Sequence, residues 1–420
     1  GLGDVYKRQL EHYLKVCGKQ FSKLLSSQQV QAEADRVWCG VERCLFGNGK
    51  ELHFKKLMDF DTIGGKSNKN GARFDLDAMH VNWLGLSLKC YLPKSENSLS
   101  YVWESLKGKI SYCNIKRLMF SSGWRYYAEI VVSGAAPTRV SIGTSTMGID
   151  PGVSTIAGVS EDACVLEELA PNAIQYEKKI QKISQRMDRS RRISNPNKYN
   201  EDGTINRSNR DPWKYSKNYV KMCRLLKSLY RKKHAYIVDS HRELCNKLIT
   251  IARYFPVEKM HFQALQKRAK ETKRQEKKTE VKQKDGTVKV IQKYKRKKRF
   301  GRSINRRAPA RFLLELKRKA EAVGGVYAEV DTKEFKASQY NHVTDTYEKI
   351  PLSQREKEIG NRKVQRDLYS AFLIRNADLD FKHPDREKCE YEFEYFADMQ
   401  DQLILKMKES GLSMRQCFGF

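Results

Sequence analysis

The sequence lacks paired cysteines, long apolar runs and a hydrophobic leader, and each absence removes a class of protein. Its ten cysteines stand singly and form no CxxC pair, so neither a zinc ribbon nor a dense disulfide framework is predicted. No run of about 18 apolar residues exists, and the first residues contain no signal-peptide core. These absences predict a protein that stays in the cytoplasm and does not bind a membrane.

Acidic residues are scarce relative to basic ones. The chain has 81 Lys and Arg against 50 Asp and Glu, a formal net charge of +31, and the excess is spread over most of its length. Each phosphate that a Lys or Arg neutralises releases condensed counterions, which makes nucleic acid the expected partner of such a surface. We therefore expect a cytoplasmic, nucleoid-associated prokaryotic protein with two or three domains in its 420 residues.

The N-terminal part divides into a helical and a β-rich segment. Residues 1–9 resemble a translated adapter sequence and are left out of the fold prediction. Apolar residues recur at helical spacing over 11–45, which predicts a helical module at 1–50. Short runs rich in Val, Ile and aromatic residues follow and predict a β-barrel or sheet at 51–137, where turn formers mark a domain boundary.

The second half alternates strands and basic helices. A hairpin is predicted around GIDPG at 148–152, followed by basic helices at 173–192 and 212–252. Asp211 and Pro212 suit the N-cap and first turn of the second helix, and the linker 194–210 is predicted to be mobile. The block 266–307 has 19 Lys or Arg against 4 acidic residues and is expected to stay solvated until it meets phosphates.

Three carboxylates lie beside apolar runs that would bury them. Asp150 ends a predicted strand, Glu258 ends the apolar run 249–260, and Asp367 opens a predicted helix at 364–376. A buried carboxylate needs hydrogen-bond partners, cationic partners or metal ions. The pattern alone leaves open whether these residues cap helices, form ion pairs, or together hold Mg²⁺ through oxygen ligands.

The segments around these carboxylates resemble known motifs. GIDPG resembles the first RuvC motif of the transposon-encoded TnpB nucleases and of the related type V CRISPR effectors. VEKMHFQAL at 257–265 resembles the second motif, and QRDLYSAFLI at 365–374 is similar to the third. The resemblance covers residues 146–376, with the three motifs in the family's order.

The resemblance implies a fold and a function. It implies an α/β RNase H-like RuvC domain at 138–420, preceded by a wedge β-barrel at 51–137 and a helical recognition module at 1–50. It implies an RNA-guided DNA endonuclease that cleaves double-stranded DNA next to a short target-adjacent motif. The guide is a transposon-end RNA, or a crRNA with or without a tracrRNA. Asp150, Glu258 and Asp367 are then the catalytic ligands of two Mg²⁺ ions, for which Mn²⁺ can substitute.

One departure concerns zinc. TnpB proteins usually carry a four-cysteine zinc ribbon between the second and third motifs, whereas residues 332–363 contain no cysteine. DTKEFKASQ at 331–339 still matches the lead-in to that ribbon. We therefore expect a degenerate target-nucleic-acid-binding insert at 332–363 that holds no zinc.

Two alternatives remain open. In another register Gln263 replaces Glu258 in the second motif, which would make the protein a nuclease-dead, RNA-guided DNA-binding repressor. The apolar spacing after Glu258, at Met260, Phe262 and Leu265, favours Glu258. The third reading is a structure-selective nuclease that works without RNA. The sequence leaves the oligomeric state open, with a monomer favoured.

Basic residues of the helices and of the 266–307 block are the predicted nucleic-acid contacts. Runs of charge are more often solvated than specific, so nonspecific phosphate contact is the preferred interpretation of the block. The predicted contacts are Lys178, Lys179, Arg186, Arg191, Arg192, Lys232, Lys233, Arg268, Lys295, Arg296, Lys297, Lys298 and Arg299.

Overall fold

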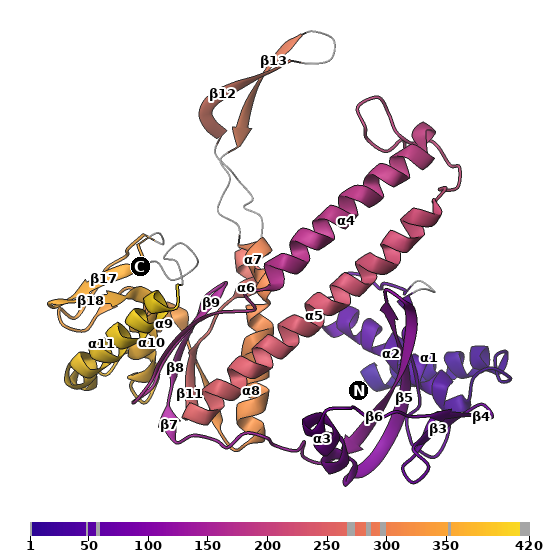
Figure 1. The fold of residues 1–420 in the computed structure, drawn as a ribbon, viewed down its shortest axis with the longest axis horizontal. Coiled ribbons are helices and arrows are strands. Elements are labelled where there is room, and N and C mark those ends of the chain that lie inside the picture. The colour runs from indigo at the N-terminus through magenta and orange to yellow at the C-terminus, as the bar shows by residue number, and fades with distance from the viewer. Residues whose placement is uncertain are drawn as a thin grey trace. The chain divides into compact units, whose positions relative to one another are not determined.

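The computed structural model describes residues 2–47, 49–55, 59–266, 274–282, 287–294, 300–351 and 354–411 (Figure 1). The chain forms two compact units, and the first division between them follows Pro137. Unit 1 comprises Gly1–Pro137 and Ile183–Arg231, and unit 2 comprises Thr138–Lys182 and Lys232–Phe420. The long helices α4 (Ala173–Ser194) and α5 (Lys217–Ile251) therefore contribute to both units. No helix in the described ranges is long and apolar enough to cross a membrane.

Unit 1 begins with two helices, in the segment where a helical module is predicted. These are α1 (Leu2–Lys19) and α2 (Ser27–Phe46), so residues 2–9, left out of the prediction, are part of a helix. A capping box fixes the start of α2: the Ser26 hydroxyl accepts from the Gln29 amide, and the Gln29 side chain accepts from the Ser26 amide.

The β-rich segment forms two antiparallel sheets. In the described residues these sheets do not close into the expected barrel. Their shared core contains Phe74, Val81 and Cys113, and it also takes Leu106 from a helix that period-two patterning did not predict. One sheet has the order β1-β5-β6 (Thr62–Gly64, Lys109–Phe120, Gly123–Ser133), and the other β2-β3-β4 (Arg73–Asp75, His80–Trp83, Leu86–Lys89); the helix is α3 (Glu96–Leu106).

Side-chain hydrogen bonds hold the segment between α4 and α5 in place, whereas the sequence predicted a mobile linker there. The buried Asn195 amide donates to the carbonyls of Arg191 and Lys214, at 2.8 Å each, and its oxygen accepts from the Lys214 amide. The N-cap predicted at Asp211 is also wrong. Helix α5 begins five residues later than Pro212, where the Ser216 hydroxyl accepts from the Tyr219 amide at 3.0 Å.

Unit 2 is built on a six-stranded mixed sheet. Its main order is β10-β9-β8-β11-β14, and β7 pairs with β11. Strands β8, β9 and β10 are antiparallel neighbours, while β8, β11 and β14 run parallel. The hairpin predicted around GIDPG is β8 with β9. The strands are β7 (Ser145–Thr146), β8 (Gly148–Pro151), β9 (Thr155–Val159), β10 (Cys164–Glu168), β11 (Ala252–Glu258) and β14 (Val326–Val330).

Helices cover both faces of this sheet (Figure 1). On one face α10 (Arg366–Arg375) and α11 (Arg386–Glu409) pack Phe372 and Phe396 against Ala157 and Val159. On the other face α5 and α8 (Pro309–Ala322) enclose the side chains of alternate strand residues, among them Ile149. Since strand side chains alternate between faces, the residue after Ile149 points toward α10.

The cysteine-free insert packs on the core of α10. Phe335, Tyr340 and Ile359 are buried in it, and the buried Lys357 ammonium donates to the Tyr340 carbonyl at 2.6 Å. Apolar packing thus holds the segment in its described residues. Its elements are α9 (Thr332–Phe335), β15 (Tyr340–Asn341), β16 (Thr346–Tyr347), β17 (Glu356–Ile359) and β18 (Arg362–Gln365).

The basic block contains regular structure at its described residues. Strands β12 (Arg274–Lys282) and β13 (Val288–Tyr294) pair antiparallel, in keeping with the alternation of apolar and basic residues in VKVIQKY. Two short helices, α6 (Phe262–Gln266) and α7 (Gly301–Arg307), flank the strand pair and contact each other. We call this pair of helices the root of the block. Arg306 pairs with Glu177 at 2.9 Å and Arg307 pairs with Glu168, so this root is tied to α4 and β10.

Two buried imidazoles in unit 2 predict loss of stability in acid. Burial lowers the pKa of His241 and of His342 to about 4, and His342 Nδ1 contacts the Tyr369 hydroxyl at 2.7 Å. The unfolded chain takes up protons near pH 6.5 and the folded chain only near pH 4, so stability falls as pH drops through this window. We expect a loss of roughly 3 kcal/mol per imidazole, measured by thermal unfolding from pH 7.5 to 4.

The pH slope distinguishes this effect from a simple loss of packing. His342→Asn should flatten the dependence whatever its stability at pH 7.5, whereas His53→Asn should keep the wild-type slope because its imidazole is exposed. Equal slopes in wild type and His342→Asn would contradict the assignment.

Candidate functional site

Asp150 lies on β8, the central strand of the unit 2 sheet. It pairs with Ala157 across the β8–β9 hairpin and follows the buried Ile149, so its side chain faces α10. Gly148 lets that helix approach. A Cβ at this position would lie 2.1 Å from the Ala371 carbonyl oxygen and 2.4 Å from the Arg375 amide nitrogen, both in α10. The first residue of the GIDPG motif thus sets the separation between β8 and α10.

Glu258 is the last residue of β11, the parallel neighbour of β8. Val257 pairs with Ile149, and both are buried on the face opposite α10. The next residue of each strand therefore points to the same side, which brings Glu258 next to Asp150. Gln263, the residue of the alternative register, lies exposed on the short helix α6.

Asp367 approaches from α10. The Gln365 side chain caps this helix by accepting from the Leu368 amide at 2.7 Å, which places Asp367 in the first turn as predicted. Its carboxylate forms ion pairs with Arg355 at 3.2 Å and with Arg366 at 3.0 Å, and its side chain is 14% exposed. Neither arginine was predicted from the sequence as a partner of Asp367. Arg366 could have been found because it directly precedes the aspartate, whereas no spacing points to Arg355.

The three carboxylates act on one another electrostatically. Burial, and then the charges of Glu258 and Asp367, raise the pKa of Asp150 well above its ordinary value. Burial and the Asp367 charge also raise the pKa of Glu258, whose side chain lies within hydrogen-bonding reach of Asp150. Residues separated by more than a hundred positions are thus brought together at one edge of the sheet.

The carboxylate oxygens of Asp150, Glu258 and Asp367 are the kind of ligand that a hard divalent cation prefers. In the described residues no group of three or more His, Cys, Asp or Glu side chains is arranged as a finished metal site, and Asp367 is engaged by two arginines. Asp150 and Glu258 are nevertheless close oxygen donors whose charges disfavour each other. A cation such as Mg²⁺ or Mn²⁺ would offset the burial and the neighbouring negative charges that raise their pKa values.

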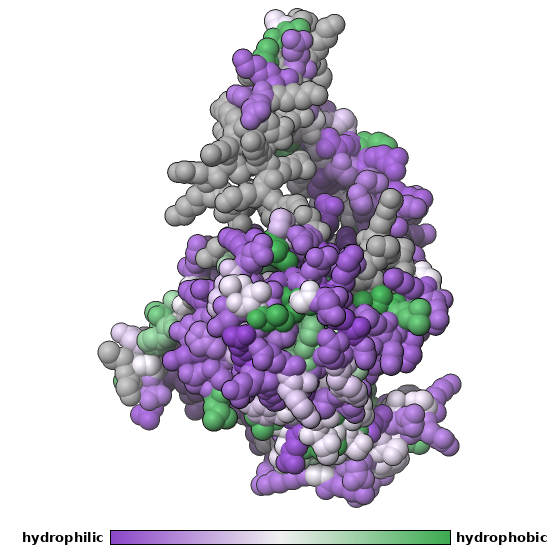
Figure 2. Space-filling view, turned by 90° about the vertical axis from the view of Figure 1, so that its left-hand side faces the viewer, coloured by the Kyte–Doolittle hydropathy of each residue, from purple (hydrophilic) through white to green (hydrophobic). Residues whose placement is uncertain are grey.

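The predicted nucleic-acid residues fall into three groups. Lys178, Lys179, Arg186 and Lys232 are exposed on α4 and α5. The other three helical residues are engaged: Lys233 pairs with Glu177 at 2.8 Å, and Arg191 and Arg192 both pair with Asp188 at 2.8 Å. Arg268 and the run Lys295, Arg296, Lys297, Lys298 and Arg299 lie outside the described residues. Figure 2 shows a face on which hydrophilic side chains predominate.

Comparison with known proteins adds little. No family model and no curated protein matches the chain. Among solved structures it is similar to a protein of the "Cryo-EM structure of CRISPR-Cas12f Ternary Complex", with a TM-score of 0.30 and 14% sequence identity over 90% of this chain and 75% of that one. A likeness at this TM-score carries no argument about the fold or activity of the chain.

Proposed function

We propose that the chain is an RNA-guided, metal-dependent DNA endonuclease with an RNase H-like catalytic domain. The observation that carries the proposal is the convergence of Asp150, Glu258 and Asp367 from β8, β11 and α10. The strand order β10-β9-β8-β11-β14, with two of the carboxylates on its adjacent central strands, supports the fold. The side-by-side position of Asp150 and Glu258 also favours an active nuclease over the repressor reading.

Each residue of the site has a defined part in this chemistry. Asp150, Glu258 and Asp367 would hold Mg²⁺, which supplies Lewis-acid stabilisation of a phosphodiester and lowers the pKa of water. Arg366 is buried and donates to both the Asp367 carboxylate and the Gln354 carbonyl, so it fixes the orientation of that carboxylate. Arg355 is more exposed and adds positive charge where a scissile phosphate would enter.

Guidance by RNA rests on charge and on the motif resemblance. A net charge of +31 needs a polyanion, and a protein that leaves sequence reading to base pairing must hold its guide stably. The structure-selective alternative predicts cleavage that depends on DNA shape alone. RNA dependence therefore separates the two readings.

The test is cleavage of a plasmid that matches the RNA co-purified with the protein from its native locus. We expect cleavage with Mg²⁺ or Mn²⁺, none with Ca²⁺, whose coordination is longer and looser, and none after chelation by EDTA. A plasmid with a scrambled target is the control. Activity in EDTA would contradict the metal site, and cleavage that survives RNase treatment before assembly would favour the RNA-independent nuclease.

A further inference from the structure

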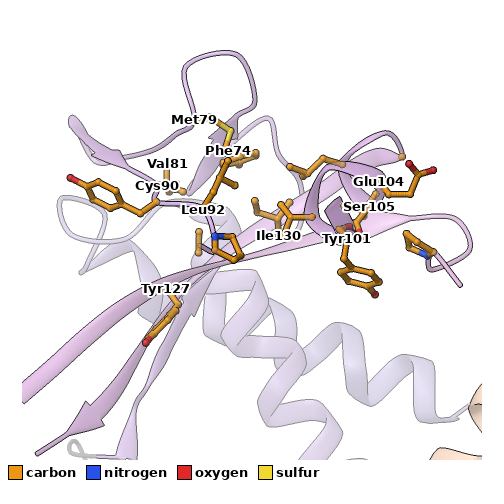
Figure 3. A pocket seen from close by; sticks show the side chains of 18 of the residues that line it. Phe74, Met79, Val81, Cys90, Leu92, Tyr101, Glu104, Ser105, Tyr127 and Ile130 are labelled. Carbon is orange, nitrogen blue, oxygen red and sulfur yellow. Dashed lines mark hydrogen bonds between the residues drawn. The ribbon is translucent and has the colours of Figure 1, made fainter. Parts of the chain in front are cut away.

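A large apolar groove lies in unit 1, outside the carboxylate site. Its volume is about 1290 Å³, and it runs between the β2-β3-β4 sheet, the β5–β6 hairpin and α3 (Figure 3). Phe74, Val81, Leu92 and Ile130 line its interior, and Tyr127 and Tyr101 lie toward opposite ends of it. The volume exceeds the ~300 to 1,000 Å³ of most small-molecule sites, which suits a segment of polymer.

Two largely exposed aromatic side chains border the groove. Tyr91 is 87% exposed and Tyr126 is 67% exposed, whereas Tyr127, the next residue of β6, stacks on Phe120 with 6.4 Å between the ring centres. Exposed aromatic side chains concentrated along one concavity are typical of a binding surface. Every nucleobase has a π-face that can stack on such rings.

Charge around the groove is positive. Lys89, Lys94 and Arg125 line it, and the Lys89 ammonium lies 5.9 Å from the centre of the Tyr91 ring. The one acidic lining residue, Glu104, is already paired with Lys107 at 2.6 Å. Cations interleaved with stacking rings are complementary to a phosphate backbone that carries unpaired bases.

We propose that this groove binds unpaired nucleotides of the RNA, with bases stacked on Tyr91 and Tyr126 and phosphates on the neighbouring cations. The inference rests on the proposed function, because it assigns a single-stranded part of the RNA partner to a place on the protein. Hydroxyl groups in the groove favour RNA over DNA, because they can hydrogen-bond to ribose 2′-hydroxyls. Ser105 and Ser133 line the groove and already donate to the carbonyls of Tyr101 and Lys109, so each can accept from a 2′-hydroxyl.

Binding is measured on the full chain with a fluorescein-labelled eight-nucleotide oligouridylate, in EDTA and about 0.3 M salt to screen nonspecific charge contacts. Tyr91→Ala and Tyr126→Ala should each weaken binding roughly 5- to 150-fold, the effect of losing one stacked base. Tyr126→Phe should retain most of the affinity because it keeps the ring. Tyr391→Ala is the matched control, since this tyrosine is 90% exposed on α11.

A second measurement locates the RNA on the wild-type protein. An oligouridylate containing 5-iodouridine should form photoadducts at the groove tyrosines, identified by mass spectrometry. Unchanged affinity in both alanine variants, or adducts confined to other regions, would overturn the proposal. Equal, equally tyrosine-dependent binding of oligothymidylate DNA or of duplex RNA would overturn the assignment to unpaired RNA.

The readout is independent of catalysis. Binding is measured without divalent metal, so it does not depend on a metal at the carboxylate site. A protein that binds as expected but never cleaves DNA would overturn the nuclease and leave the groove assignment standing.

Discussion

Replacing any one of the three carboxylates by its amide should lower DNA cleavage at least about a thousand-fold. Asp150→Asn, Glu258→Gln and Asp367→Asn keep the shape of the side chain but remove the charge that would hold a divalent cation, which is worth several kcal/mol in the transition state. RNA-dependent DNA binding should persist, because affinity comes from base pairing and from many Lys and Arg contacts. Plasmid cleavage and filter binding measure the two effects separately.

The same variants should change thermal stability in opposite directions. Asp150→Asn removes a carboxylate that burial and two neighbouring charges disfavour, so the melting temperature of the metal-free protein should rise by about 2 to 4 °C. Asp367→Asn removes the acceptor of Arg355 and Arg366 and should lower it. Gln263→Ala is the control for the register. Full cleavage by Glu258→Gln together with an inactive Gln263→Ala would establish the alternative alignment.

The second large effect is expected from a single added methyl group. In Gly148→Ala the new Cβ would meet backbone atoms of α10 at 2.1 and 2.4 Å, so β8 and the helix must move apart. Overpacking of a backbone contact costs at least about 3 kcal/mol, which corresponds to a fall of roughly 6 to 12 °C in melting temperature. Cleavage should be lost even below that temperature, because β8 and α10 carry different carboxylates of the site.

Gly301→Ala is the matched control for this substitution. Among the described residues no heavy atom lies within 4 Å of its added Cβ, and the residue begins helix α7, where alanine is a better helix former. It should therefore unfold and cleave like wild type. A Gly148→Ala protein with wild-type stability would contradict the close contact between β8 and α10.

The parts of this site that could be predicted from the sequence depend on short-range pattern. Apolar runs marked the segments that form β8 and β11, and the helix predicted at 364–376 corresponds to α10 and holds Asp367 in its first turn. That Asp150 and Glu258 are neighbours could not be read from spacing, because it requires the parallel pairing of Val257 with Ile149 across more than a hundred residues. The motif resemblance supplied that step, but no motif or spacing predicted that Arg355 would pair with Asp367.

The errors also have physical causes. Residues 96–106 form α3 inside a segment that appeared to be entirely β-rich, because packing of Leu106 and Val102 on the sheet core outweighs local propensity. The segment rich in Asn, Gly and Ser was expected to move, yet Asn195 replaces a missing backbone ladder with three hydrogen bonds of its own. The composition of a segment does not predict which of its side chains will form hydrogen bonds with the rest of the fold.

The root of the basic block has a consequence for how this protein can change. Because α6 and α7 contact each other, the two ends of the block lie close together, and the pairs Arg306 with Glu177 and Arg307 with Glu168 tie this point to α4 and β10. Residues 267–299 are thus inserted between two elements that are neighbours in space. A lineage, or an engineer, could shorten this segment, lengthen it or exchange it for a foreign domain while the sheet that carries the carboxylates keeps its form.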